Sequence, residues 1–142
     1  MRWSRRCSSG SESQPAVPRR IGVAPRRKED DRPLAAALVR ALQSREAKID
    51  RIFFDWRGGR DPGADKFPSE PFRALAAALK GRERPPAHPY WSDAEPCSMH
   101  IDEVEAIWSA IADRDDWGPF EAKIAAVRRM GEALAADVAP PA

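Results

Sequence analysis

The sequence has no long apolar segment, few cysteines and few residues that favour β-strands, and each shortage excludes a class of protein. No apolar run approaches the roughly 20 residues needed to span a bilayer, so we expect neither an integral membrane protein nor a membrane partner. The two cysteines, Cys7 and Cys97, cannot build a disulfide scaffold and favour a reducing, cytoplasmic compartment. No stretch alternates apolar and polar residues as a half-buried strand does.

The motifs of common catalytic sites are also missing. The sequence contains no GxGxxG, no Walker A motif, no kinase-type catalytic loop and no HExxH. We therefore expect no catalytic residue, no resident cofactor and no established metal site in this chain. A secretory signal is excluded as well, because the N-terminus lacks an apolar stretch of 7–15 residues.

The charge is divided unevenly along the 142 residues. Residues 1–28 hold eight basic residues and one acid, a net charge of +7, whereas residues 29–142 carry a net charge of −5. Three of the fourteen prolines, Pro15, Pro18 and Pro25, interrupt this basic segment. It is predicted to be a disordered tail, because it offers little apolar surface to offset the entropy lost on ordering. Two more specific alternatives are an organellar transit peptide and a segment that contacts nucleic acid, with Trp3 stacking on a base.

Residues 29–142 are predicted to form an all-α fold of about five short helices. Three of these helices are expected in the first half. The first runs from about Asp31 to Arg45, is capped by Asp30 or Asp31, and has an inward face of Leu34, Leu38, Ala41 and Leu42. The second starts near Asp50, is ended by Gly58 and Gly59, and has an inward face of Ile49, Ile52, Phe53 and Trp56; the third is capped by Ser69, is ended by Gly81, and has an inward face of Phe72, Leu75 and Leu79. Residues 60–68 and 82–96 are predicted loops, the second with Tyr90 and Trp91 pinned onto the helical core.

The last two helices are predicted to form an antiparallel hairpin around a turn at residues 113–117. The first is expected to be capped by Ser98 and to bury Ile101, Val104, Trp108 and Ile111; the second, starting at Gly118 and Pro119, is expected to bury Phe120, Ile124, Val127, Met130 or Gly131, Leu134 and Val138.

Three side chains are the candidates for a metal or thiol site. Cys97 and His100 have a spacing found in metal sites, and His88 lies upstream, but a structural zinc needs a fourth ligand such as Asp93, Glu95 or the distant Cys7. A thiol at a helix start with a histidine nearby is also a possible nucleophile. The simpler interpretation is a packed cysteine and two ordinary histidines.

Charged groups offer two further candidates. Asp102 and Glu105 share a helix face and are suitable ligands for a hard cation, although helix-dipole and capping roles explain the acidic groups at 102–105 and 113–116 without a ligand. Residues 57–60, with the sequence RGGR, could approach an anion. A helix C-cap is the preferred interpretation, because the phosphate-loop spacing is incomplete.

Seven short runs together are similar to a known family: FFDWRGG (53–59), HPYW (88–91), PCSM (96–99), IDEVEAIW (101–108), RDDW (114–117), FEAK (120–123) and MGEA (130–133). In this order they resemble the C-terminal region of the bacterial selenoprotein O (YdiU) family, from near Glu29 almost to the end. The resemblance implies the C-terminal part of a kinase-like enzyme that transfers AMP from ATP to protein hydroxyls with a divalent metal such as Mg²⁺.

The resemblance carries no catalytic residue into this chain. The nucleotide-binding lysine, the phosphate-binding loop and the metal-binding Asp and Asn belong to an earlier region of the family, and the family's cysteine- or selenocysteine-bearing tail has no counterpart here. A truncated gene product or a misassigned start would explain the unrelated basic tail. The leading hypothesis is thus a helical segment of a selenoprotein O-like protein adenylyltransferase, inactive alone, which packs on a kinase-like core or self-associates. The rival is a stand-alone helical binding module whose basic tail contacts nucleic acid or an acidic partner.

Overall fold

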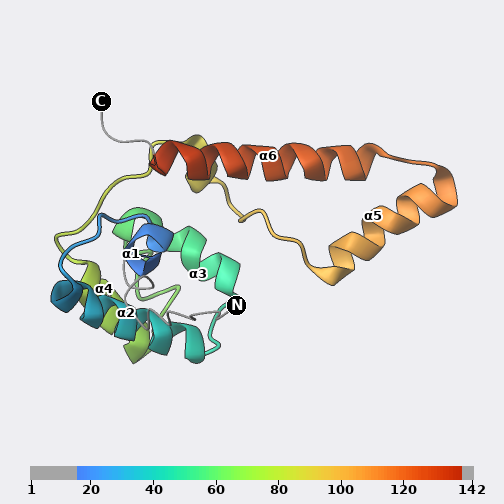
Figure 1. Cartoon of the computed structure of the whole chain (residues 1–142). Helices are drawn as coiled ribbons and strands as arrows, with labels where there is room; N and C mark the ends of the chain where they lie inside the picture. The colour runs from blue at the N-terminus through green and yellow to red at the C-terminus, as the bar shows by residue number, and fades with distance from the viewer. Residues whose placement is uncertain (1–15, 139–142) are drawn as a thin grey trace, which may run out of the picture.

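The computed structural model describes residues 16–138, and within this range the chain is entirely helical (Figure 1). This part of the chain contains six α-helices, two short 3₁₀ helices and no strand, which confirms the all-α prediction. None of its helices is both long and apolar enough to cross a bilayer.

The first helix, α1 (Ala16–Ile21), lies in the segment for which the sequence predicts disorder. Ile21 is fully buried and Val23 nearly so, and both belong to the main hydrophobic core. Pro18 is tolerated because it sits in the first helical turn, where a backbone N–H has no intrahelical acceptor. The predicted disordered tail is therefore wrong for residues 16–28, and its remainder, including Trp3 and Cys7, lies outside the described residues.

The α2 helix (Lys28–Gln43) begins three residues before the predicted start, so neither Asp30 nor Asp31 is its N-cap. Asp31 is instead buried, and its carboxylate accepts bonds from the Arg26 backbone N–H at 3.0 Å and from Arg82 Nη2 at 2.5 Å. A carboxylate that reaches back to a backbone N–H before the helix stabilises its start much as a capping box does. The buried ion pair with Arg82 also fastens this start to the segment after α4.

The remaining helices of the core follow the predicted pattern closely. They are α3 (Ile49–Asp55), the 3₁₀ helix η1 (Arg57–Gly59) and α4 (Glu70–Leu79), and α4 lies alongside α2 (Figure 1). Ser69 occupies the N-cap position of α4 as predicted, although its hydroxyl makes no capping bond. The buried core consists of Ile21, Val23, Leu34, Ala37, Leu38, Ala41, Ile52, Trp56, Phe67, Phe72, Leu75 and Leu79. We call residues 16–82 the body.

A long connection leads from the body to the last two helices. It contains the 3₁₀ helix η2 (Pro89–Ser92), in which Tyr90 and Trp91 are buried, as the sequence predicts. The α5 helix (Ile101–Arg114) leads into a turn, and the α6 helix (Gly118–Val138) leads back from it, so the chain direction reverses between the two helices (Figure 1). We call these two helices the hairpin. Its helices diverge from the turn and do not pack along their full lengths (Figure 1).

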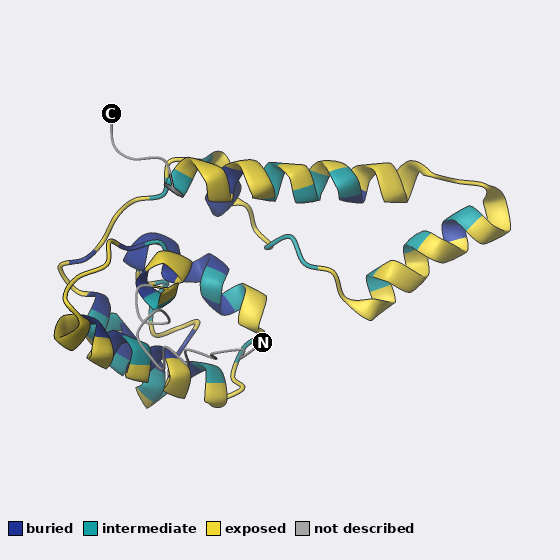
Figure 2. Cartoon of the chain, viewed as in Figure 1, coloured by how far each residue is buried: buried dark blue, intermediate teal, exposed yellow. Residues whose placement is uncertain are grey.

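The predicted inward face of α5 is wrong for three of its four residues, and the fourth, Ile111, is half-buried. Ile101 and Trp108 are each 68% exposed and Val104 is 40% exposed. Most of α5 is exposed (Figure 2). The side facing α6 instead carries Glu103, Ile107 and the fully buried Ala110, at i, i+4 and i+7. The periodicity correctly placed the large apolar residues on one side of α5. The side that packs against α6 is a different one, where Lys123 of α6 pairs with Glu103.

Two smaller expectations about the hairpin also fail. The N-cap of α5 is His100 and not Ser98, whose carbonyl oxygen accepts a bond from Lys123 Nζ at 2.5 Å. On α6, Phe120 and Leu134 are each 40% exposed, whereas Ile124, Val127 and Met130 are half-buried. Among residues 118–137 of α6, the buried positions are Lys123, which bonds to the Ser98 carbonyl and to Glu103, and Ala133, which packs with Phe54, Tyr90 and Trp91.

Candidate interaction site

An aromatic cluster joins the body to the hairpin. Phe54 of α3 meets the Tyr90 ring edge-to-face at 5.4 Å and the Trp91 ring at 5.8 Å, and the Tyr90 and Trp91 rings lie 4.9 Å apart. Ala133 of α6 completes this second core, with Met130 and Cys97 packed against it. Such ring pairs contribute about 0.5–1.5 kcal/mol each beyond the area they bury, so the cluster is a substantial anchor for α6.

Each ring of the cluster has an arginine over it. The guanidinium of Arg57 lies 4.6 Å from the Trp91 ring centre, that of Arg60 lies 5.7 Å from Phe54, and that of Arg129 lies 5.6 Å from Tyr90. Planar guanidinium groups stack on aromatic faces with a favourable cation–π attraction.

Two of these arginines are also bound to acids: one pair joins the body to α6, and the other joins α6 to the connection that contains η2. Arg57 is buried, pairs with Asp137 at 2.8 Å and donates to the Arg20 carbonyl at 2.9 Å. It thus connects α1, the aromatic cluster and the end of α6. Arg129 pairs with Asp93 in the η2 connection.

Burial and ion pairing shift the pKa values of groups in this cluster. Burial raises the pKa of the Tyr90 phenol above 10.0, and its hydroxyl oxygen accepts a bond from the Cys97 backbone N–H at 2.8 Å. The hydrogen bond from Arg129 lowers the pKa of Asp93 below 3.8. Burial lowers the pKa of Arg60, although Asp55 opposes this shift. These shifts favour the neutral phenol of Tyr90 and the ionised carboxylate of Asp93.

The RGGR run at residues 57–60 forms a turn, in agreement with the preferred C-cap interpretation. Gly58 has φ of +71° and its carbonyl accepts the Arg84 N–H at 2.7 Å. A Cβ at this position would lie 2.1 Å from the Arg84 carbonyl oxygen. Only glycine fits, because the backbone is left-handed and the next segment crosses directly over it.

The structure does not bring the three metal or thiol candidates into one site. The Nδ1 atom of His88 accepts the Tyr90 N–H at 3.1 Å, Cys97 packs against the aromatic cluster and His100 is the exposed N-cap of α5. Among residues 16–138, no three side chains of His, Cys, Asp or Glu converge as metal ligands do.

Half of the acids in the two clusters are bonded within the chain, whereas no basic side chain among residues 16–138 pairs with the two cation-ligand candidates, Asp102 and Glu105. Glu103 pairs with Lys123 at 2.6 Å. At the turn, Asp115 accepts the Trp117 indole N–H at 3.0 Å and Asp116 accepts the Gly118 N–H at 3.0 Å. These bonds support the structural interpretation of the turn.

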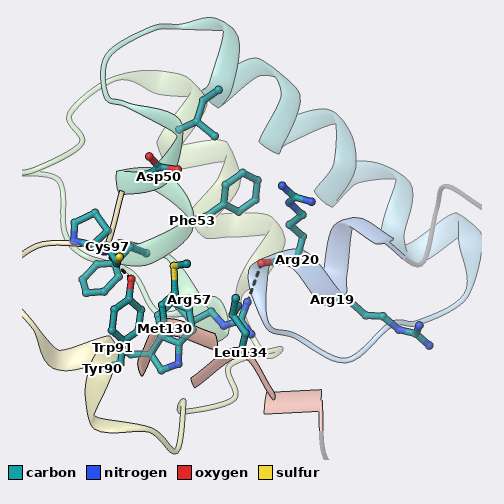
Figure 3. Close-up of a pocket in the computed structure, with 13 residues that line it drawn as sticks. Arg19, Arg20, Asp50, Phe53, Arg57, Tyr90, Trp91, Cys97, Met130 and Leu134 are labelled. Atoms are coloured by element: carbon teal, nitrogen blue, oxygen red, sulfur yellow. Dashed lines mark hydrogen bonds between the residues drawn. The ribbon is translucent and has the colours of Figure 1, made fainter. Parts of the chain in front are cut away.

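A cleft of about 440 Å³ opens between the body and α6 (Figure 3). Its walls come from α1, α3, η2 and α6, and the lining includes Arg19, Arg20, Ile49, Phe53, Met130 and Leu134. Figure 3 shows Arg20 beside Phe53, where its guanidinium lies 5.6 Å from the ring centre, whereas Arg19 extends away from it. Sequence reasoning missed this cleft, because one wall belongs to the segment predicted to be disordered.

Most of the exposed large apolar side chains of the described residues lie on the hairpin, in its turn or just before it. Seven of the nine are found there, each at least 40% exposed: Met99, Ile101, Val104, Trp108, Trp117, Phe120 and Leu134. Exposed apolar patches mark interaction sites, and Ile101, Val104 and Trp108 share one side of α5. We call the Ile101, Val104 and Trp108 side of α5 its outward face.

Comparisons with family models, with curated proteins and with solved structures find no match for this chain. The candidate site therefore consists of three features of the chain itself: the aromatic cluster, the cleft with arginines at its edge, and the outward face of α5.

Proposed function

We propose that this chain is a protein-docking module that seats the outward face of α5 on a larger partner. The observation that carries the proposal is the exposure of Ile101 and Trp108, both 68% accessible, on a helix whose opposite side is already packed. Large apolar and aromatic side chains in such positions are the usual anchors of protein interfaces.

The family resemblance supplies the identity of the proposed partner. IDEVEAIW at residues 101–108 is the longest run similar to the selenoprotein O family, and it contains the three residues of the outward face of α5. We therefore propose the kinase-like core of a selenoprotein O-type protein adenylyltransferase as the surface on which α5 sits. In this proposal ATP and Mg²⁺ bind to that core, which performs AMP transfer, and the present chain contributes contacts and no catalytic group.

The test is a binding measurement between this chain and the kinase-like core of a bacterial selenoprotein O family enzyme prepared without its own C-terminal region. We expect saturable binding by biolayer interferometry, lost in the double variant Ile101→Asp/Trp108→Asp. Val39→Asp is the matched control, because Val39 is an apolar side chain of α2 that is 49% exposed and lies outside the hairpin. Equal binding by all three proteins, or no binding to a monodisperse core, would refute the proposal.

A second candidate function is nucleic-acid binding through the basic N-terminal segment. Residues 1–28 carry a net charge of +7, and Arg19 and Arg20 of this segment are exposed on α1. Fluorescence anisotropy with a labelled single-stranded oligonucleotide tests it, since binding of this type weakens steeply with salt. Deletion of residues 1–15 together with Arg19→Ala/Arg20→Ala should abolish such binding, whereas Ile101→Asp/Trp108→Asp should leave it unchanged.

A further inference from the structure

The outward face of α5 is acidic as well as apolar. Ile101, Val104 and Trp108 repeat at i, i+3 and i+7, and Asp102 and Glu105 border them on one side. The whole helix holds four acids and one base. Among the described residues, no basic side chain pairs with Asp102 or Glu105.

The cleft has the opposite character. Its floor is aromatic and aliphatic, with Phe53, Met130 and Leu134. At its lip Arg20 lies beside Phe53, and Arg19 lines the same edge but extends away from that ring (Figure 3). Neither of these two arginines pairs with an acid within residues 16–138. Asp50 is the one acid in the lining, and the charge of the third arginine, Arg57, is already neutralised by Asp137. The volume of about 440 Å³ lies within the range of ligand pockets, roughly 300–1,000 Å³.

The α5 helix is held away from the cleft of its own chain. Lys123 of α6 binds both the Ser98 carbonyl and the Glu103 carboxylate, which fixes the start of α5 beside α6. Residues Glu103 and Ala110 then turn toward α6 and the outward face turns away from it. The helix that complements the cleft in charge and polarity therefore has to come from another molecule.

We infer that the outward face of α5 of one copy docks in the cleft of a second copy. Trp108 and Val104 would supply apolar anchors, and Asp102 and Glu105 would lie near the arginine lip. This arrangement is a helix-in-groove contact. In the inferred dimer, the α5 helix of each copy lies in the cleft of the other, so the same contact is made twice and the two-fold arrangement is closed. The inference goes beyond the proposed function, since it requires no kinase-like core.

The experiment is a charge-reversal series followed by sedimentation velocity on the full chain. We expect a concentration-dependent dimer for the unchanged protein. Arg19→Glu/Arg20→Glu and Asp102→Lys/Glu105→Lys should each raise the dimer dissociation constant at least about tenfold, equivalent to about 1.4 kcal/mol. Arg73→Glu is the matched control, because Arg73 is exposed on α4 and does not line the cleft.

The decisive variant combines all four reversals in one chain and should restore the dimer. A restored dimer cannot be explained by misfolding, because folding defects from the separate substitutions would add together in the combined variant. The inference would be overturned if the unchanged protein were a monomer at all concentrations, or if every variant dimerised equally. It would also be overturned if the two double variants weakened dimerisation and the combined variant did not restore it. Failure here is distinct from failure of the proposed function, because Arg19→Glu/Arg20→Glu leaves the outward face that the kinase-like core would bind.

Discussion

The body and the hairpin have similarly patterned helices but use their apolar residues in different ways. In the body, Trp56 is 1% exposed and packs against the rings of Phe67 and Phe72. In the hairpin, Trp108 is 68% exposed. Both tryptophans lie in stripes of the same periodicity. The difference teaches that an amphipathic pattern specifies a face, whereas its burial depends on whether another element is available to cover it.

The two regions also differ in how they are fixed. The body is held by a continuous apolar core and the buried Asp31–Arg82 ion pair. The hairpin is held by the small aromatic cluster and by the bonds of Arg57, Lys123 and Arg129. Polar bonds of this kind are directional and position an element without burying much of it. They leave the outward face of α5 accessible while the hairpin stays attached.

The largest expected effect compares the two tryptophans directly. Trp56→Ala removes a fully buried ring and should lower the free energy of unfolding by about 3–5 kcal/mol. Trp108→Ala should change it by less than about 0.5 kcal/mol, because the ring is mainly in solvent. Urea titration monitored by far-ultraviolet circular dichroism measures both. Equal losses would mean that the hairpin has a core of its own and would break the comparison.

An intermediate effect is expected from two glycines with similar backbones. Gly58 and Gly81 have φ of +71° and +79°, but only Gly58 faces a neighbouring carbonyl. Gly81→Ala should cost about 1 kcal/mol from the left-handed conformation alone. Gly58→Ala should cost about 2 kcal/mol or more, because overpacking adds to the strain. Thermal unfolding of the pair tests this; identical melting temperatures would show that the segment after α4 moves freely over η1.

The smallest effect concerns alkaline pH and the anchor of the hairpin. Because the folded pKa of Tyr90 is raised above 10.0 by burial, the folded chain holds the phenol proton more tightly than the unfolded chain. The resulting stability is fully present below pH 10 and is lost as pH rises through the folded pKa. Tyr90→Phe should remove this pH dependence and cost about 1 kcal/mol at neutral pH by leaving the Cys97 N–H without its acceptor.

That pH prediction is measured as the difference between the unchanged protein and Tyr90→Phe in urea titrations from pH 8 to 11. The difference cancels the titration of the groups that both proteins share, such as the lysines, and leaves the contribution of Tyr90. We expect the gap between the two proteins to narrow as pH rises. A gap that stays constant would show that Tyr90 ionises as freely in the folded chain as in the unfolded one.

Much of the body could be predicted from the sequence because its signals are local. Pro71 and Phe72 after Ser69, and Gly81 after Leu79, delimit α4 within a residue or two. The pair of glycines after Trp56 likewise marks the end of α3. These residues act through backbone conformation, which is determined by neighbours in the chain.

The candidate site was less predictable because its components meet only in the folded chain. The stacking of Arg57 on Trp91 and its bond to Asp137 join residues far apart in sequence, and no spacing rule anticipates them. The α1 helix was missed because its proline and two arginines match the composition of a disordered tail. Ile21 is buried all the same, since η1 and α2 provide a surface for it.

The bond between Arg82 and Asp31 also has a consequence for the order in which the chain folds during translation. Every residue of the main core, and both members of this ion pair, are synthesised before α5 and α6. Because domains generally fold as they emerge, N-terminal part first, the body can close while the ribosome is still making the hairpin. The later helices then arrive at a finished surface, where the aromatic cluster is the last part to assemble.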